Sequence, residues 1–235
     1  MASIIVKLEC VTNMHVGNGD VNYNIIDNEV ERDPVTGYPT INSSGVKGAL
    51  REYFNNNNKD VIDDIFGGEN GQGQVKILGA DMVAMPGRAT GGDVPFYLIS
   101  TKQAYERTLE LGNLFVEKDI INKSSKAIEI EVEGIKPCSV IEFAGKDIYV
   151  INEEEFATIS LPVLARNKLN NGVSENLWYE EVVPHESVFV FPAISEDKNL
   201  LDKFASTIDG KIVQFGGNAS IGYGLCKVSI IKKED

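Results

Sequence analysis

Hydrophobic residues recur along this chain in two different spacings, one typical of strands and one typical of helices. The order of these segments restricts the folds that the chain can adopt. From Val6 to Cys10, apolar and polar residues alternate one by one, which is the pattern of a half-buried β-strand. From Ser44 to Asn55, the apolar residues return every three or four positions, as on one face of a helix. The same change of period recurs toward the C-terminus, where a helical pattern over residues 200–208 ends at Gly210 and strands follow.

Further segments extend this alternation through the whole chain. Helices are expected at 61–66 and Thr101–Leu111, and strands at Lys76–Met85, Val94–Ser100, 128–133, Ser139–Phe143, Lys146–Ile151, Ser187–Phe191, Lys211–Phe215 and Gly224–Ile231. Breaks are expected at Gly67–Gln74 and Pro86–Gly92, because glycine and proline interrupt regular structure. The order of strand, helix, strands, helix and strand predicts an α+β protein whose ferredoxin-like (RRM-like) core, a split βαβ unit, carries insertions.

Length and cysteine usage indicate one domain that depends on neither a zinc site nor disulfides. The chain has 235 residues, and we predict a single domain over residues 1–235 with an inserted loop or thumb region around residues 115–185. Cys10, Cys138 and Cys226 form no CxxC pair, so they predict neither a zinc site nor a disulfide framework. Cys10 and Cys226 occupy core-facing strand positions and are expected to be buried thiols. Signal-peptide and membrane-span patterns are absent, so we expect a cytoplasmic protein that contacts no membrane.

The helix that begins near Ser44 presents a polar face suited to a phosphate backbone. Ser44, Lys47, Gly48 and Arg51 share one side of the helix at i, i+3, i+4 and i+7. This side offers a hydroxyl, two cations and a glycine gap that a sugar–phosphate chain can approach, and Ser43 adds another cap oxygen at the anion-attracting N-terminus. The alternative is a solvated face whose glycine packs tightly on a neighbouring element. The spacing alone leaves both readings open.

A second candidate site is the glycine-rich stretch from Gly216 to Gly224, between two strand patterns. Four glycines in nine residues suit a backbone loop that lies against a ligand, with its amides directed at phosphates. The spacing differs from the dinucleotide-binding fingerprint, and no helix follows. A flexible hairpin turn is the alternative reading.

A third candidate lies in the polar stretch from Asn13 to Asn42, which is too rich in glycine, asparagine and acid to form core. Asp27 follows Ile25 and Ile26, and a carboxylate held by such apolar anchors can bind a hydrated metal ion or position a ribose hydroxyl. An ordinary solvated aspartate is the alternative. In the same stretch, His15 precedes a glycine turn and is either a general base or a structural histidine.

Several of these segments, taken in this order, resemble the RAMP superfamily of CRISPR proteins. The segments that carry the resemblance are His15–Gly19, Ile26–Asp27, Gly37–Arg51, Ile65–Gly67 and Gly216–Gly224. Within that superfamily, Met85–Arg88 and Glu175–Glu181 are similar to the repeated backbone subunit of the type III-B (Cmr) effector complex. The likeness touches both ends and the middle, so it covers most of the chain.

The resemblance implies a filament of identical subunits laid along CRISPR RNA. It implies that Asp27 supports cleavage of the paired target RNA, with a divalent metal ion (Mg²⁺) at Asp27 and the ribose hydroxyl as internal nucleophile. The RNA-binding residues expected from the motifs and the resemblance are His15, Ser43, Ser44, Lys47, Arg51, Arg88, Arg166, Gly217, Asn218, Ser220 and Gly222. The implied partners are CRISPR RNA, single-stranded target RNA, copies of the same chain and other subunits of the complex.

The net charge sets a condition on this function. The 22 Lys and Arg residues are outnumbered by 35 Asp and Glu residues, which gives a formal net charge of −13. Proteins that hold nucleic acid alone usually carry a positive field. We therefore expect the basic groups to be concentrated on one face, other subunits to contribute, and the isolated chain to bind RNA weakly.

Three alternatives differ from an RNA-guided endoribonuclease in ways that experiments can separate. A non-catalytic scaffold of the same superfamily binds RNA without cutting it. A CRISPR-RNA-processing enzyme uses His15 as a base and needs no metal ion. A metabolite-binding α+β protein uses the glycine-rich loop for a small ligand and has no affinity for RNA in any assembly.

Overall fold

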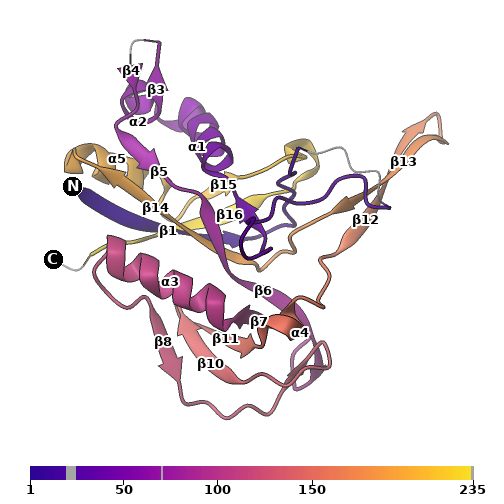
Figure 1. Ribbon diagram of the computed structural model, residues 1–235. Helices are drawn as coiled ribbons and strands as arrows, with labels where there is room; N and C mark the ends of the chain where they lie inside the picture. Colours follow the sequence, from indigo (N-terminus) through magenta and orange to yellow (C-terminus); the bar gives the residue numbers. More distant parts are fainter. Residues whose placement is uncertain (20–24, 70, 234–235) are drawn as a thin grey trace.

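A mixed β-sheet with helices on both faces forms the body of the protein (Figure 1). The computed structural model describes residues 1–19, 25–69 and 71–233. The helices are α1 (Ser43–Asn57), α2 (Ile62–Phe66), α3 (Lys102–Phe115), α4 (Glu153–Phe156) and α5 (Lys198–Ile208), with 3-10 turns η1 (Lys59–Val61) and η2 (Ala219–Ile221). The strands are β1 (Ala2–Cys10), β2 (Thr40–Ile41), β3 (Gly67–Gly68), β4 (Gly71–Gln72), β5 (Val75–Ile77), β6 (Ala80–Gly91), β7 (Phe96–Thr101), β8 (Ile121–Ser124), β9 (Glu131–Val132), β10 (Ser139–Phe143), β11 (Lys146–Ile151), β12 (Val163–Asn170), β13 (Val173–Glu181), β14 (Val188–Ser195), β15 (Ile212–Gln214) and β16 (Leu225–Ile231). This mixture of helices and strands confirms the expected α+β class.

The core of the sheet is four strands in the order β16–β1–β14–β6, and each neighbouring pair is antiparallel. In the middle strand β1, Leu8 lies opposite Phe189 of β14 and opposite Val228 of β16. Leu8 packs on one face of the sheet and Ile5 on the other, and both are fully buried. The alternating pattern of the first ten residues therefore produces a central strand that is covered on both faces along much of its length.

Two helices cover one face of this core and a third covers the other. α1 and α5 pack together through Phe54 and Phe204, whose rings stack with centroids 5.9 Å apart, over the face that contains Leu8. α3 lies on the opposite face, where Leu111 joins Ile5 in a second apolar cluster. In both cases the helix packs on the sheet through apolar residues that recur at helical spacing and so lie on one side of the helix. Within the residues that the structure describes, no helix is both long enough and apolar enough to cross a membrane.

The expected break at Pro86–Gly92 is wrong, because β6 continues to Gly91. Up to Ala84 the strand pairs with β14, from Met85 to Arg88 it pairs with β7, and its last residues pair with β9. Pro86 therefore lies beyond the ladder with β14, where a strand tolerates a residue that lacks an N–H group. β6 is the element that joins the core to the second part of the sheet, β7–β11–β10–β8.

Residues 115–185 contain strands as well as loops. β8, β10 and β11 extend the sheet beyond β7, and β12 and β13 form a separate two-stranded hairpin that projects from the body (Figure 1). The strand expected at 128–133 is wrong for most of its length, since only Glu131–Val132 is a strand. The flexible loop expected at 67–74 contains the short hairpin β3–β4, and residue 70 lies outside the described residues.

Gly87 offers a direct test of how β6 packs in its second half. A Cβ atom at this position would lie 2.5 Å from Val132 Cγ1 and 2.9 Å from Ile99 Cδ1. We expect Gly87→Ala to lower the free energy of unfolding by about 1–3 kcal/mol through overpacking, as measured by urea denaturation. Gly91→Ala in the same strand is the matched control, because its new Cβ would meet nothing closer than 3.6 Å. Equal stability of the two variants would contradict the packing.

Candidate functional site

A buried carboxylate, Glu180 of β13, connects three segments that are far apart in the sequence. Its side chain is 5% exposed, and Oε1 accepts a hydrogen bond from Asn218 Nδ2 at 2.7 Å. Oε2 accepts one from Arg166 Nη1 at 3.0 Å, and His15 Nε2 lies 3.9 Å from Oε1. The glycine-rich loop, the β12–β13 hairpin and the segment after β1 therefore meet at one group. We call His15, Arg166, Glu180 and Asn218 the loop junction.

Arg166 is held by the protein itself at this junction. Its guanidinium carbon lies 5.6 Å from the centroid of the Trp178 ring and 5.5 Å from that of Tyr223, in addition to the ion pair with Glu180. Such cation–π contacts and a charge-assisted hydrogen bond fix the planar group in place. Arg166 was expected to contact RNA, but its charge is paired with a buried carboxylate, so it supports the hairpin first.

His15 occupies a structural position in the loop junction. The side chain is buried, and its Nδ1 lies 2.7 Å from the carbonyl oxygen of Glu181, so Nδ1 carries the proton that donates to this oxygen. The carbonyl oxygen of His15 accepts a hydrogen bond from Gly217 N at 2.8 Å. His15 therefore ties the glycine-rich loop to β13 through both its ring and its backbone, and this geometry agrees with the structural-histidine reading.

The glycine-rich loop has a defined conformation that requires its glycines. A Cβ at Gly216 would lie 2.3 Å from the carbonyl oxygen of His15, and one at Gly224 would lie 1.8 Å from that of Phe215. The amides of Gly217 and Gly222 donate to protein carbonyls. The expectation that these two amides point at phosphates is therefore wrong, because both are already satisfied within the protein.

The outer part of the loop remains accessible. Asn218 adopts the left-handed conformation at φ 60°, which turns the chain so that its side chain reaches Glu180. Ser220 and Ile221 lie on the exposed turn η2, with Ile221 50% exposed. Ser220 is thus the member of the expected set in this loop whose hydroxyl faces the surroundings.

Asp27 is held beside the loop junction by main-chain pairing. Its amide donates to the carbonyl oxygen of Tyr179 at 3.0 Å, and its Oδ2 accepts from Tyr179 N at 2.8 Å. The expectation that apolar neighbours anchor it is wrong for Ile25, whose side chain is 86% exposed. The carboxylate is exposed, and Oδ1 has no hydrogen bond or ion pair within the described residues. Asp27 therefore offers one free oxygen from a fixed backbone position.

The expected face of α1 is present, but its members differ in what they offer. Ser43 and Ser44 are exposed, and neither caps the helix, because Asn42 is the N-cap residue and makes no side-chain cap hydrogen bond. A Cβ at Gly48 would meet nothing within 4 Å, so the reading of a tightly packed glycine is wrong. Lys47 is half-buried and makes no ion pair within the part of the chain described.

Arg51 and Arg88 complete the expected set of basic residues. Arg51 Nη1 donates to the carbonyl oxygen of Gly67 at 2.6 Å and lies near Asp63, so it fastens α1 to the end of α2. Arg88 is exposed on β6, not in a loop, and its backbone pairs with Glu133. Among the described residues, no hydrogen bond or ion pair joins the α1 face or Arg88 to the loop junction.

A divalent metal ion at Asp27 would need further ligands from the RNA. Within the residues described, no group of three or more His, Cys, Asp or Glu side chains is arranged to hold a metal ion. Asp27 supplies one carboxylate oxygen, and Mg²⁺ is often held by one or two carboxylates together with waters and substrate phosphates. The donor set fits a hydrated Mg²⁺ that is shared with a phosphate, and it does not fit an ion held by protein alone.

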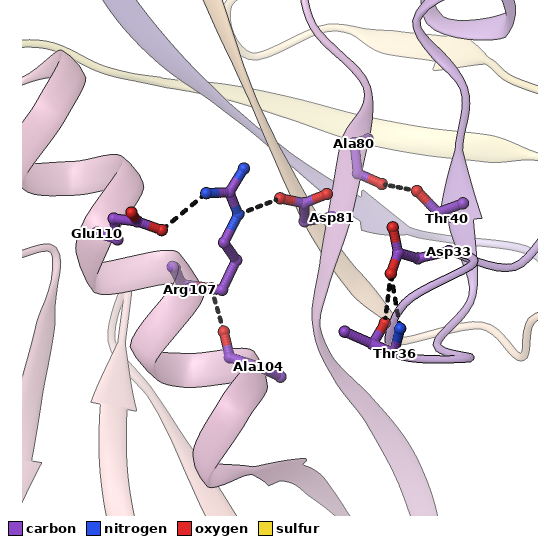
Figure 2. Close-up of polar contacts among 9 residues, drawn as sticks. Asp33, Thr36, Thr40, Ala80, Asp81, Ala104, Arg107 and Glu110 are labelled. Carbon is purple, nitrogen blue, oxygen red and sulfur yellow. Dashed lines mark hydrogen bonds and ion pairs between the residues drawn. The ribbon is translucent and has the colours of Figure 1, made fainter.

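A separate cleft of 650 Å³ lies between α3, β6 and residues 33–40 (Figure 2). Its charged lining consists of Asp33, Asp81, Glu106, Glu110 and Glu153 with Lys102 and Arg107. Arg107 bridges Asp81 at 3.1 Å and Glu110 at 2.7 Å, and burial raises the pKa of the Asp81 carboxyl although Arg107 opposes this. The excess of acid disfavours phosphate, and none of the expected RNA-binding residues lines the cleft.

Comparison with known proteins identifies the family. The model of the RAMP superfamily matches residues 7–227, which is nearly the whole chain. The chain belongs to the RAMP superfamily. One RAMP relative is the CRISPR system Cmr endoribonuclease Cmr4 of Pyrococcus furiosus, 27% identical over 285 residues, with 98% of this chain and 96% of the relative covered.

Solved structures share the fold of this RAMP chain. The type III-B Cmr-beta complex bound to cognate target RNA contains a chain with a TM-score of 0.78 and 20% identity, covering 98% of this chain and 97% of that one. The same complex in its apo state gives 0.75 at 20% identity, with 98% of both chains covered. Oligomeric Cmr4 from Pyrococcus furiosus gives 0.72 at 18% identity, with both chains fully covered.

Sequence reasoning missed the role of the acidic pair in this RAMP protein. Glu180 forms the loop junction, and Glu181 accepts from Arg32 at 2.6 Å and from Val30 N at 3.1 Å, which positions the segment after Asp27. Both carboxylates are buried. The available signal was two adjacent acids directly before the apolar pair Val182 and Val183, where a strand enters the core.

We expect Glu180→Ala to destabilise this RAMP domain by about 3 kcal/mol, because it leaves Arg166 without its counter-charge in a largely buried place. Urea denaturation measures the change. Glu175→Ala, which removes an exposed ion pair with Lys168, is the control and should leave the stability nearly unchanged. If both variants lose the same small amount, Glu180 does not organise the junction.

Proposed function

We propose that this chain is a backbone subunit of a type III-B CRISPR effector complex that binds CRISPR RNA and cleaves the paired target RNA. The observation that carries the proposal is Asp27, an exposed carboxylate on a loop that main-chain hydrogen bonds hold against Tyr179. The end-to-end similarity to a Cmr endoribonuclease supports it. A metabolite-binding role has no comparable support, since the glycine-rich loop directs two of its amides inward.

We further infer that the four central strands and two helices form a ferredoxin-like core. The supporting observations are the antiparallel order β16–β1–β14–β6 and the two crossovers, α1 after β1 and α5 before β16. In such a split βαβ arrangement, the connections that leave one end of the sheet lie close together. That end carries both the segment after β1 and the glycine-rich loop.

RNA would be held by neutral groups and lysine more than by arginine. Ser43, Ser44 and Lys47 offer hydroxyls and one cation that has no ion pair among the described residues, beside the open gap at Gly48. Ser220 offers a further hydroxyl on the glycine-rich loop. These contacts recognise the sugar–phosphate backbone, so the sequence of the target would be read by pairing with the guide RNA.

Cleavage would use Asp27 to orient the reacting ribose. The ribose 2′-hydroxyl attacks the adjacent phosphate, and Oδ1 of Asp27 is free to accept its hydrogen bond and align it with the leaving oxygen. A bound Mg²⁺ would supply charge neutralisation at the phosphate. His15 would position the glycine-rich loop and would not act as the base, because its ring is buried and bonded to Glu181.

The acidic balance of the chain makes assembly part of this proposal. A formal net charge of −13 repels a polyanion at long range, so the isolated chain should hold RNA poorly. In the complex, copies of the chain and the other subunits would each contribute a few contacts to the same guide RNA. We place this assembly in the cytoplasm, where the guide and target RNAs meet.

Asp27→Ala tests the cleavage role. In the assembled complex we expect cleavage of guide-matched target RNA to fall by at least about 100-fold, with guide and target binding unchanged. Asp60→Ala, an exposed aspartate on η1, should cleave like the parent. EDTA should abolish cleavage and Mg²⁺ restore it. Full activity of Asp27→Ala with normal binding would remove Asp27 from the cleavage mechanism.

Lys47→Ala and Gly48→Ala test the α1 face. Lys47→Ala removes one phosphate contact per subunit, so we expect it to weaken guide binding. It should also reduce the slope of log K against log salt concentration by about 0.7 for each subunit. Gly48→Ala should stabilise the helix by about 1 kcal/mol but weaken guide binding, because its methyl group enters the gap. Lys123→Ala on β8 is the control. An unchanged salt slope for Lys47→Ala would remove this face from the RNA interface.

A further inference from the structure

The two buried cysteines lie side by side where the ends of the chain meet. Cys10 of β1 and Cys226 of β16 are cross-strand partners, both fully buried, with Sγ atoms 3.7 Å apart. Cys10 N donates to the carbonyl oxygen of Ser187, and Cys10 O accepts from Glu186 N, so both backbone groups of Cys10 face β14. Cys10 and Cys226 are therefore a non-hydrogen-bonded pair.

This geometry suits a covalent link. In non-hydrogen-bonded antiparallel pairs the Cα atoms are about 4.5 Å apart, which falls within the range of about 4.4–6.8 Å that a disulfide spans. The sulfur atoms are already in van der Waals contact, so a small rotation of the two side chains brings them to bonding distance. The third cysteine, Cys138, is exposed and directly precedes β10, in the second part of the sheet.

We propose that Cys10 and Cys226 are a redox modification site, a dithiol that a peroxide converts into an intramolecular disulfide. The Cys10 thiolate attacks a peroxide oxygen, the O–O bond breaks, and Cys10 becomes a sulfenic acid while one water leaves. Cys226 sulfur then attacks Cys10 sulfur, the S–O bond breaks, and a second water leaves. The two thiols lose two protons and two electrons, and hydrogen peroxide takes them up. The site is independent of the proposed RNA function.

A buried hydroxyl next to Cys10 assists the first step. Ser187 precedes β14 and, by alternation, lies on the same face as Phe189, which packs in the cluster that contains Cys10. Its Oγ is buried and has no hydrogen-bond partner among the residues described. The contact with Cys226 and burial raise the pKa of Cys10 well above its ordinary value. Rotation of the Ser187 hydroxyl toward the Cys10 thiolate supplies the hydrogen bond that stabilises it.

The disulfide would fasten the root of the glycine-rich loop to β1. Leu225 directly precedes Cys226, and its carbonyl oxygen already accepts hydrogen bonds from Val11 N and Thr12 N. A bond between residues 10 and 226 closes a loop of nearly the whole chain, and such a link restricts the unfolded chain strongly. Oxidation would therefore keep the two ends of the domain together under conditions that otherwise separate them.

The test uses the full chain with Cys138→Ser, so that no exposed thiol remains. The folded protein is treated with hydrogen peroxide, denatured, alkylated and mapped by mass spectrometry. We expect one linked peptide pair that contains Cys10 and Cys226, no alkylation before reduction, and a Tm higher by about 5–10 °C that dithiothreitol reverses.

Two further variants keep the interpretation specific. Cys10→Ser in the same background should show neither the linked pair nor the Tm shift. Ser187→Ala should form the disulfide about three- to tenfold more slowly, which corresponds to one hydrogen bond. The proposal is overturned if both cysteines remain alkylatable after peroxide, if each is oxidised separately to a sulfinic acid, or if the link joins two chains. An unchanged rate for Ser187→Ala removes the serine from the mechanism.

Discussion

The pairing of β1 with β14 and β16 is the constraint on which the rest of the molecule depends. Because both pairs are antiparallel, the end of β1 lies beside the starts of β14 and β16, as the partners Glu9–Val188 and Cys10–Cys226 show. The segment after β1, the segment before β14 and the loop before β16 must therefore leave the sheet at the same end. Those three segments carry His15, Glu180 and Asn218. The loop junction is thus a consequence of strand order before any side chain is considered.

Electrostatics then decides how an acidic chain can serve an RNA function. Four of its arginines are engaged by protein groups: Arg32 with Glu181, Arg51 with Gly67, Arg107 with Asp81 and Glu110, and Arg166 with Glu180. An arginine bound to a carboxylate contributes little field to a passing phosphate. These four arginines therefore hold protein segments in place, while exposed hydroxyls, Lys47 and Arg88 remain for a ligand. Such a surface suits many weak contacts that are repeated along a guide RNA better than tight binding by a single subunit.

Much of the fold was predictable because its core elements are long and periodic. α1 and α5 each bury one apolar stripe, and β1 buries the alternate residues Val6, Leu8 and Cys10, so the positions of all three elements agree with the patterns that indicated them. The β12–β13 hairpin was missed because most of its side chains are exposed, so it lacks an apolar period. Pro86 was misread as a break because its tolerance depends on where the β14 ladder ends, and pairing partners cannot be deduced from local composition.

The candidate site was predictable in its motifs but not in the roles of its members. Glu180 acquires its meaning from Arg166 in the preceding strand and from Asn218, which lies 38 residues further along the chain. A local sequence pattern does not show that Glu180 contacts either of these residues. Gly217 and Gly222 were expected to bind through their amides, yet a glycine can be required because a carbonyl passes close to it, as at Gly216. Residue type identified the loop, and only tertiary contacts showed which of its atoms are occupied.

One strand places the two halves of the candidate site relative to each other. At Tyr179 the backbone of β13 holds Asp27, and at the next residue the side chain of Glu180 holds the glycine-rich loop. The main-chain groups of Tyr179 lie along the edge of the strand and the side chain of Glu180 projects from its face, so two adjacent residues of β13 support Asp27 and the loop. Because Asp27 is held by main-chain atoms, its position does not depend on the side chain at 179. In the proposed function, an RNA that lies across the loop would meet Asp27 at a distance that β13 helps to fix.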